Sequence, residues 1–160
     1  MKTSPLVTAG LVLGMGFAAF FDGIVLHQIL GWHHLICTTA TCRPTSVADL
    51  QQKNTQDGYF HLFAYFIVLS GTALLFRAAR DRTAAWSGKA FLGAVLAGAG
   101  LFNVVEGIID HHLLQIHHVR PGADQAAWDW GFLGCSLVIG LVGAALLRSG
   151  TPGAPAEATG

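Results

Sequence analysis

Charged side chains are scarce in this sequence: Asp, Glu, Lys and Arg together make up 11% of its 160 residues. Soluble domains carry about 25%, so the chain has too few charged groups to cover a water-facing surface. The few charges lie in short segments between long apolar runs, as in membrane proteins with several spans. The formal net charge of zero argues against nucleic acid as a partner, because nucleic-acid binding requires a basic face.

Cysteine is also rare, with three residues in the chain. Cys135 lies within an apolar run, whereas Cys37 and Cys42 lie close together in a polar segment. This pair predicts either a small disulfide in an oxidising compartment or two thiolate ligands for a metal ion. The sequence leaves both interpretations open.

Apolar runs are abundant, and four of them reach the roughly 20 residues that cross a bilayer. The first could pass for a signal peptide, but its end recurs later in the chain, so we interpret it as a span. The predicted fold class is all-α, an integral membrane four-helix bundle over residues 1–148, followed by a disordered tail over 149–160. The predicted spans are Pro5–Trp32, Gly58–Phe76, Ala90–Ile116 and Trp130–Leu147.

Basic residues predict how these spans are oriented. The positive-inside rule places both termini and the middle connection in the cytoplasm and the other two connections outside. The inner side would carry Lys2, Arg77, Arg80, Arg82, Lys89 and Arg148, and the outer side Arg43, Lys53 and Arg120.

The most specific feature is an internal repeat. Residues 22–34 read D-G-I-V-L-H-Q-I-L-G-W-H-H and align without gaps with residues 106–118, E-G-I-I-D-H-H-L-L-Q-I-H-H. Each copy is followed by a further span that begins with a matching Asp, at Asp57 and Asp129. The pattern predicts two parallel helix-pair repeats related by a pseudo-two-fold axis along the membrane normal. The repeats cover 5–78 and 90–148.

Helical geometry indicates which side chains in the repeat can converge. At 100° per residue, Asp22 and His33 point to one side of a helix, and His27 and His34 to another about 120° away. The second copy repeats this pattern, while His112 falls on a different face. A rise of 1.5 Å per residue places the first acid of each copy roughly 15 Å below its double histidine. An ionisable group at that depth in a membrane is a functional candidate.

We therefore predict an outward-facing metal site that holds one metal ion or two. Imidazole with carboxylate suits iron, zinc or copper, and facing helices of four-helix bundles carry di-metal carboxylate sites. The protein would be a redox enzyme or a metal-binding or delivery protein. The candidate ligands are His27, His33, His34, His61, His111, His117 and His118, with Asp22, Asp57, Glu106, Asp110 and Asp129 as carboxylate ligands or as partners that orient the imidazoles.

Two other hypotheses fit the same residues. His27 and His111 are equivalent residues on two helices and could be the axial ligands of a haem. The acids and histidines could instead form a proton or ion path without metal, since such paths also use Asp, Glu and His within spans.

Two resemblances bear on these hypotheses. The runs H-Q-I-L-G-W-H-H and Q-I-H-H resemble the histidine boxes of membrane di-iron desaturases and hydroxylases, with different spacings. The longer runs F-F-D-G-I-V-L-H-Q-I-L-G-W-H-H, D-G-Y-F-H and L-F-N-V-V-E-G-I-I-D-H-H-L-L-Q-I-H-H-V resemble a bacterial family of predicted membrane proteins, domain of unknown function 2243. That resemblance spans roughly Pro5 to Leu147. It implies a bacterial inner-membrane protein that accompanies copper-handling assembly factors of the respiratory cytochrome oxidase, which favours copper; the segment with Cys37 and Cys42 departs from the family pattern.

Overall fold

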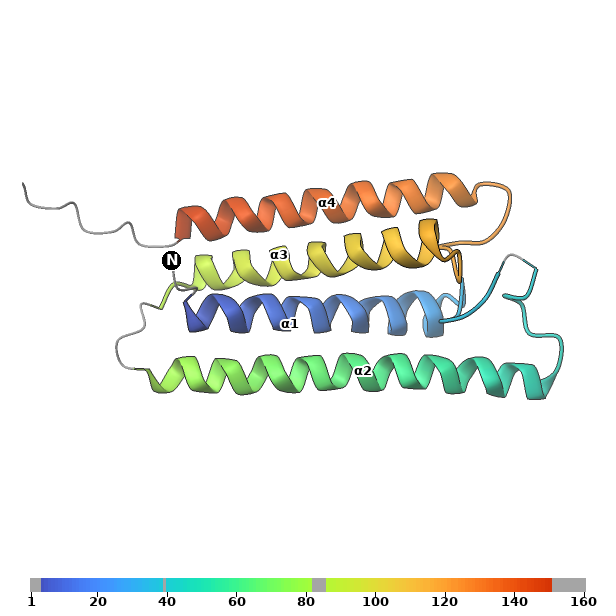
Figure 1. Cartoon of the computed structure of the whole chain (residues 1–160), viewed down its shortest axis with the longest axis horizontal. Coiled ribbons are helices and arrows are strands. Elements are labelled where there is room, and N and C mark those ends of the chain that lie inside the picture. Colours follow the sequence, from blue (N-terminus) through green and yellow to red (C-terminus); the bar gives the residue numbers. More distant parts are fainter. Residues whose placement is uncertain (1–3, 39, 82–85, 151–160) are drawn as a thin grey trace, which may run out of the picture.

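Four long helices make up the fold (Figure 1), which a computed structural model describes for residues 4–38, 40–81 and 86–150. Each is long and apolar enough to cross a membrane, and the described residues contain no strand. This confirms the predicted fold class. The helices are α1 (Pro5–Phe21), α2 (Val47–Arg80), α3 (Gly88–Glu106) and α4 (Gln125–Gly150); the π-helices η1 (Asp22–Ile29) and η2 (Gly107–Leu113) continue α1 and α3.

The helices pack side by side in the order α2, α1, α3, α4 (Figure 1). In the described part of the chain, α1 packs on α2 and α3, and α3 packs on α4, but α2 and α4 do not touch. The central pair α1 and α3 runs in the same direction. A two-fold axis between them would exchange α1 with α3 and α2 with α4, as the repeat in the sequence requires.

Glycines bring the central helices together. A Cβ atom on Gly14 of α1 would collide with the backbone of Val95 in α3, and one on Gly98 of α3 would collide with the backbone of Leu11 in α1. Gly14 and Gly98 are equivalent residues of the two repeats. Small residues allow close helix approach in lipid, where apolar side chains gain nothing by leaving the solvent. The central contact is therefore symmetric and made largely by backbone.

The polar connection before α2 is shorter than predicted. The helix begins at Val47 rather than Gly58, because Ser46 accepts a hydrogen bond from the backbone N–H of Asp49 at 3.1 Å and caps the first turn. At the other end of the chain, α4 includes Ser149 and Gly150, which were predicted to belong to the disordered tail. The rest of that tail, 151–160, and the basic residues Lys2 and Arg82 lie outside the described residues.

Apolar side chains cover the outer faces of α2 and α4. Only 11% of the most apolar stretch of α4 is buried, and 17% of that of α2. Phe66 on α2 is 57% exposed and Leu141 on α4 is 61% exposed. Such surfaces are stable in hydrocarbon and not in water, so these faces are the ones that contact lipid.

Candidate metal centre

The end of each central helix is wound as a π-helix, and this winding brings an acid and a histidine together. In an α-helix, residues five apart point about 140° away from each other. In a π-helix, whose backbone hydrogen bonds join residues five apart, they lie on the same side. In η1, His27 Nε2 lies 3.0 Å from Asp22 Oδ2. In η2, His111 Nε2 lies 3.1 Å from Glu106 Oε1.

Two residues after the end of each π-helix, the backbone is left-handed, at Gly31 (φ 57°) in the first repeat and at Gln115 (φ 51°) in the second. The N–H of Trp32 donates to the carbonyl of Leu26, and that of Ile116 to the carbonyl of Asp110, both at 3.0 Å. Glycine is the usual residue at such a helix end because it adopts a positive φ without strain. These turns direct the double histidines back toward the helices.

The fold-back overturns the predicted depth of the acids. His117 Nε2 lies 2.9 Å from Glu106 Oε1, and His33 Nε2 lies 3.6 Å from Asp22 Oδ1. The expected separation of roughly 15 Å assumed that the helices continue to Trp32 and Ile116. They end at Ile29 and Leu113 instead.

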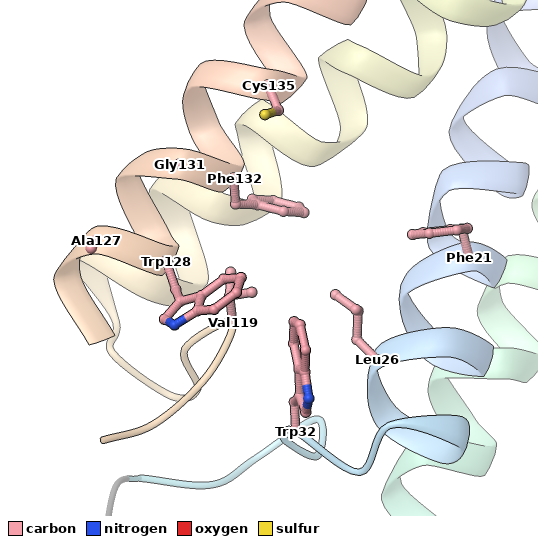
Figure 2. Close-up of a pocket in the computed structure, with 9 residues that line it drawn as sticks. All are labelled: Phe21, Leu26, Trp32, Val119, Ala127, Trp128, Gly131, Phe132 and Cys135. Carbon is pink, nitrogen blue, oxygen red and sulfur yellow. The ribbon is translucent and has the colours of Figure 1, made fainter. Parts of the chain in front are cut away.

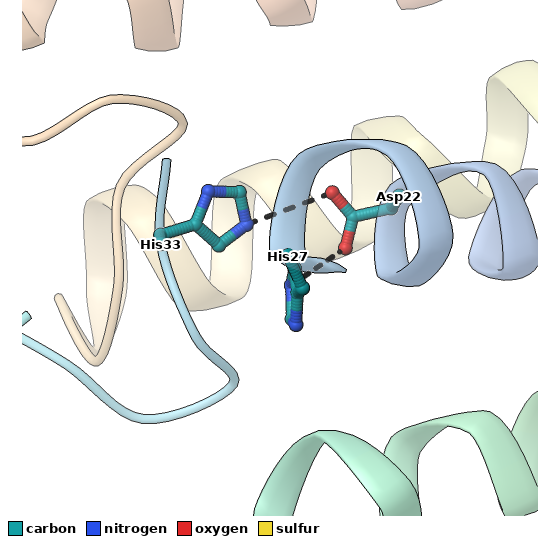
Figure 3. A group of neighbouring side chains, drawn as sticks. All are labelled: Asp22, His27 and His33. Atoms are coloured by element: carbon teal, nitrogen blue, oxygen red, sulfur yellow. Dashed lines mark ion pairs between the residues drawn. The ribbon is translucent and has the colours of Figure 1, made fainter. Parts of the chain in front are cut away.

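Two buried triads result, one in each repeat. Asp22, His27 and His33 offer three ligand atoms within 4.8 Å of one another, and Glu106, His111 and His117 do the same. In Figure 3, the Asp22 carboxylate directs one oxygen at the His27 ring and the other at the His33 ring. The triads are neighbours, because the His33 and His117 rings stack with centroids 4.8 Å apart.

In three of the four triad histidines, a hydrogen bond holds Nδ1, the ring nitrogen that faces away from the triad carboxylate. The exception is His111, whose Nδ1 makes no hydrogen bond and lies 3.6 Å from Asp129 Oδ1. His33 Nδ1 donates to the carbonyl of Val119 at 2.8 Å, and His117 Nδ1 donates to the carbonyl of Leu35 at 2.9 Å. A carbonyl only accepts, so both Nδ1 atoms carry hydrogen. His27 Nδ1 bonds the Asp57 carboxylate at 2.9 Å. In a neutral imidazole the other nitrogen, Nε2, then presents a lone pair, and it faces the carboxylate of the triad.

This arrangement fits a metal ion. The Nε2 atoms of His27, His33 and His111 are buried and make no hydrogen bond, although carboxylate oxygens lie within 3.6 Å. A lone pair that faces a carboxylate is repelled unless a proton or a metal cation lies between them. Metal-bound histidines have this pattern, with the distal N–H donated to a carboxylate or a backbone carbonyl.

The equivalent residues His33 and His117 differ in their affinity for a proton. Burial lowers the pKa of His33, whose contact with Asp22 is the longer one. Burial also acts against protonation of His117, but its hydrogen bond to Glu106 and the charge of that carboxylate outweigh burial and raise the pKa. With metal absent, a proton can therefore occupy the second triad on His117.

Asp57 and Asp129 lie behind the triads. Asp57 is fully buried and accepts hydrogen bonds from His27 and from His34 Nδ1 at 2.7 Å, from Gln28 at 3.0 Å and from the N–H of Leu35 at 2.8 Å. At the equivalent place, Asp129 accepts from His118 Nδ1 at 2.7 Å and from the N–H of Val119 at 3.0 Å. These aspartates orient the rings and fix the loops that carry them.

The structure thus places six of the twelve predicted site residues in the two triads. His61 packs against Gly23, where a Cβ atom would lie 2.5 Å from its Nε2. Leu133 occupies the same position against Gly107 in the second repeat. Packing of a large side chain against the glycine therefore accounts for His61 at this position. Asp110 is half-buried beside the second triad. The six outside the triads are His34, His61, His118, Asp57, Asp110 and Asp129.

Sequence reasoning missed the two carbonyl acceptors, those of Leu35 and Val119. No side-chain pattern marks a backbone acceptor. Both residues directly follow a double histidine, so the repeat itself was the one available signal. His112, predicted to be the least suitable ligand, packs its ring against Trp130 at 4.6 Å and belongs to neither triad.

Cys37 and Cys42 are joined by a disulfide. Of the two interpretations of this pair, a disulfide or two thiolate ligands, the structure therefore has the disulfide. The bridge lies next to the first triad. Cys37 is buried, its N–H donates to the carbonyl of Ile116 at 2.8 Å, and its sulfur accepts from the N–H of His34 at 3.3 Å. The bridge therefore holds the loop that follows His33.

Replacing both Cys37 and Cys42 by alanine is expected to lower the free energy of unfolding by about 2 kcal/mol, because the unfolded chain regains the entropy that closing so short a loop removes. Metal content should not change, because neither sulfur belongs to a triad. Unfolding in mixed micelles and elemental analysis of the same samples measure the two quantities. Loss of metal from the double variant would contradict this prediction and would favour Cys37 and Cys42 as thiolate ligands.

The four apolar helices and the buried centre at one end of them define an all-helical integral membrane protein. The chain belongs to the family described as predicted membrane protein, DUF2243, whose family model matches residues 9–150. No curated protein and no solved structure matches the chain.

Proposed function

We propose that this protein is a membrane metalloprotein in which each triad binds one divalent metal ion, so that the two triads form a dinuclear His/carboxylate centre. One observation carries the proposal. In the first triad, the buried Nε2 atoms of His27 and His33, whose rings are fixed through Nδ1, face the Asp22 carboxylate without a hydrogen bond. A bound cation converts this repulsion into ligation.

The composition of each triad favours iron or zinc. Two histidines and one carboxylate form the facial arrangement of non-haem iron enzymes, and His₂Glu also occurs in zinc enzymes. Copper(I) prefers soft sulfur ligands, and the two sulfurs near the site are joined in the disulfide. The case for copper and for respiratory oxidase assembly as a partner process therefore rests on the family resemblance.

Between an enzyme and a delivery protein, the geometry favours a metal-dependent membrane oxidoreductase. Three protein ligands leave coordination positions open for water or a substrate. The ligands are also deeply buried, with His27 at 2% and His33 at 1% exposure, whereas a protein that passes metal to a partner needs ligands at its surface. When bound, the metal would supply Lewis-acid or redox chemistry, and the protein would fix its ligands.

Haem fits the geometry less well. The carboxylates of Asp22 and Glu106 lie 3.0 and 3.1 Å from the Nε2 atoms of His27 and His111. If these Nε2 atoms were axial ligands, the haem would have to occupy the space that the two carboxylates fill. A haem between the two histidines would therefore have to displace both acids.

A proton path is the alternative that the contacts themselves favour. Carboxylates and imidazoles alternate in each repeat, from Asp57 to His33 in the first and from His117 to Asp129 in the second. The two series meet where the His33 and His117 rings stack. Both series lie at one end of the molecule. In α1, Pro5–Phe21 contains no charged residue, and in α3 none lies between Lys89 and Glu106. A path across the whole membrane would need polar groups there, so a relay could serve this face only.

We further propose that the metal centre faces outward in the inner membrane of a bacterium, with both termini in the cytoplasm. The N-terminal end of α1 and the C-terminal end of α4 lie at the end of the bundle opposite the centre (Figure 1). The basic residues Arg77, Arg80 and Lys89 lie at that end, which the positive-inside rule assigns to the cytoplasm.

Elemental analysis of the protein purified in mild detergent, with an absorption spectrum of the same sample, tests the proposal. We expect about two equivalents of iron or zinc per chain and no Soret band. A Soret band would replace the proposal by haem binding. Absence of metal after purification and after reconstitution with iron, zinc or copper would refute it and leave the proton path.

A further inference from the structure

An apolar cavity of about 530 Å³ lies beside the metal centre (Figure 2). Phe21 and Leu26 border it on the side of α1 and η1, Phe132 and Trp128 on the side of α4, and Trp32 at the end near the loops. Its volume is in the range of about 300–1,000 Å³ typical of ligand sites. No charged residue lines it. Because α1 and α4 do not pack on each other within the described residues, the cavity lies in the gap between them.

A second, polar cavity of about 390 Å³ adjoins the first at Trp32. Its lining includes two arginines, Arg43 and Arg120. The Arg120 guanidinium lies 5.5 Å from the ring centres of both Trp32 and Trp128, so it is held at the boundary between the cavities. Neither arginine has a carboxylate partner within ion-pair distance among the described residues. Their positive charge is therefore available to an anion.

On the opposite face of the pseudo-two-fold axis, the residues equivalent to the lining of the apolar cavity differ from it. Asp110 is the equivalent of Leu26, Gln56 of Trp128, and Tyr59 of Gly131. Tyr59 supplies a large side chain where Gly131 leaves space, since a Cβ atom on Gly131 would meet nothing within 4 Å. The repeat alone therefore does not account for the cavity, and its lining is particular to one face.

From these observations we propose that the two cavities together bind one anionic phospholipid. The acyl chain lies in the apolar cavity, against the aromatic rings, and the phosphate lies in the polar cavity between Arg43 and Arg120. Trp32 and Trp128 stand at the level where tryptophan meets lipid head groups. Basic pockets between spanning helices recognise anionic head groups in the same way. This lipid site is independent of whether the triads hold metal.

Native mass spectrometry of the full chain in detergent tests the proposal, with phosphatidylglycerol and phosphatidylcholine of identical acyl chains as probes. We expect one phosphatidylglycerol per chain, bound about tenfold more tightly than phosphatidylcholine, because two arginines contribute at the head group. The same spectra report the oligomeric state. Equal binding of both lipids, or a dimer that binds neither, would overturn the proposal.

Two sets of variants locate the site. Gly131→Phe fills the cavity and should abolish tight binding, whereas Gly134→Phe is the matched control on the same helix: it also has open space but does not line the cavity. Arg43→Gln with Arg120→Gln should remove the preference for phosphatidylglycerol and keep weak binding of both lipids. Equal binding by the two glycine variants would refute the location. Metal content, measured on the same samples, should be unchanged in all of them.

Discussion

His27→Ala is expected to remove one of the two metal ions, His111→Ala the other, and the double variant both. Each substitution leaves one histidine and one carboxylate in its triad, and two ligands hold a divalent ion far less tightly than three. The two histidines are equivalent residues in contact with different acids, His27 with Asp22 and His111 with Glu106. Elemental analysis of detergent-purified protein measures the loss, and gel filtration verifies that each variant is folded.

His112→Ala is the matched control for this experiment. His112 adjoins His111 in the chain but packs on Trp130 outside the triad, so its removal should leave both ions in place. Glu106→Gln provides a second test that preserves shape, since it removes only the charge of a ligand and should also cost one ion. Unchanged metal content in the His27 and His111 variants would exclude the triads as the binding sites.

Asp57→Ala is expected to give the largest loss of stability, about 3–5 kcal/mol, as when one partner of a buried charged pair is removed. Asp57 is fully buried and accepts four hydrogen bonds. Its loss leaves those donors unsatisfied in the interior, including the Nδ1 of His27 and His34. Unfolding by SDS in mixed micelles measures the change.

Asp129→Ala should destabilise the protein less, since Asp129 accepts two hydrogen bonds and its distance to His111 Nδ1 is 3.6 Å. Asp124→Ala, at the exposed position directly before α4, should cost no more than the roughly 1 kcal/mol of a lost helix cap. The ranking of the three variants is the test. An Asp57 variant as stable as the Asp124 variant would mean that water replaces the lost carboxylate and that the site is wetter than its burial indicates.

The spans and the repeat could be predicted from the sequence because they depend on composition and spacing. Apolar runs separated by polar segments predict four helices, and the matched acids and histidines predict a paired site. Those features follow from the order of residue types alone. The convergence of Asp22 and His33 in the first triad depends instead on the chain reversal at Gly31, whereas the prediction assumed a continuous helix.

The geometry of the triads could not be predicted, for two physical reasons. The π-winding of η1 and η2 rotates His27 and His111 toward the acids, and no residue type encodes that winding. The chain reversal is marked by Gly31 in the first repeat but by Gln115 in the second, and glutamine is no signal for a left-handed residue. An assumption of unbroken α-helix therefore separated groups that are in contact.

The rings of His33 and His117 are each anchored by a carbonyl from the opposite half of the chain, Val119 for the first and Leu35 for the second. Two identical subunits related by a two-fold axis form such reciprocal hydrogen bonds, because each subunit contributes the same surface to the interface. A single helix pair could not hold its own histidine ring in place. An ancestor with only one such pair would have gained an ordered centre only by meeting its own copy. Duplication with fusion would then have freed the two halves to diverge, as the equivalent residues Leu26 and Asp110 do.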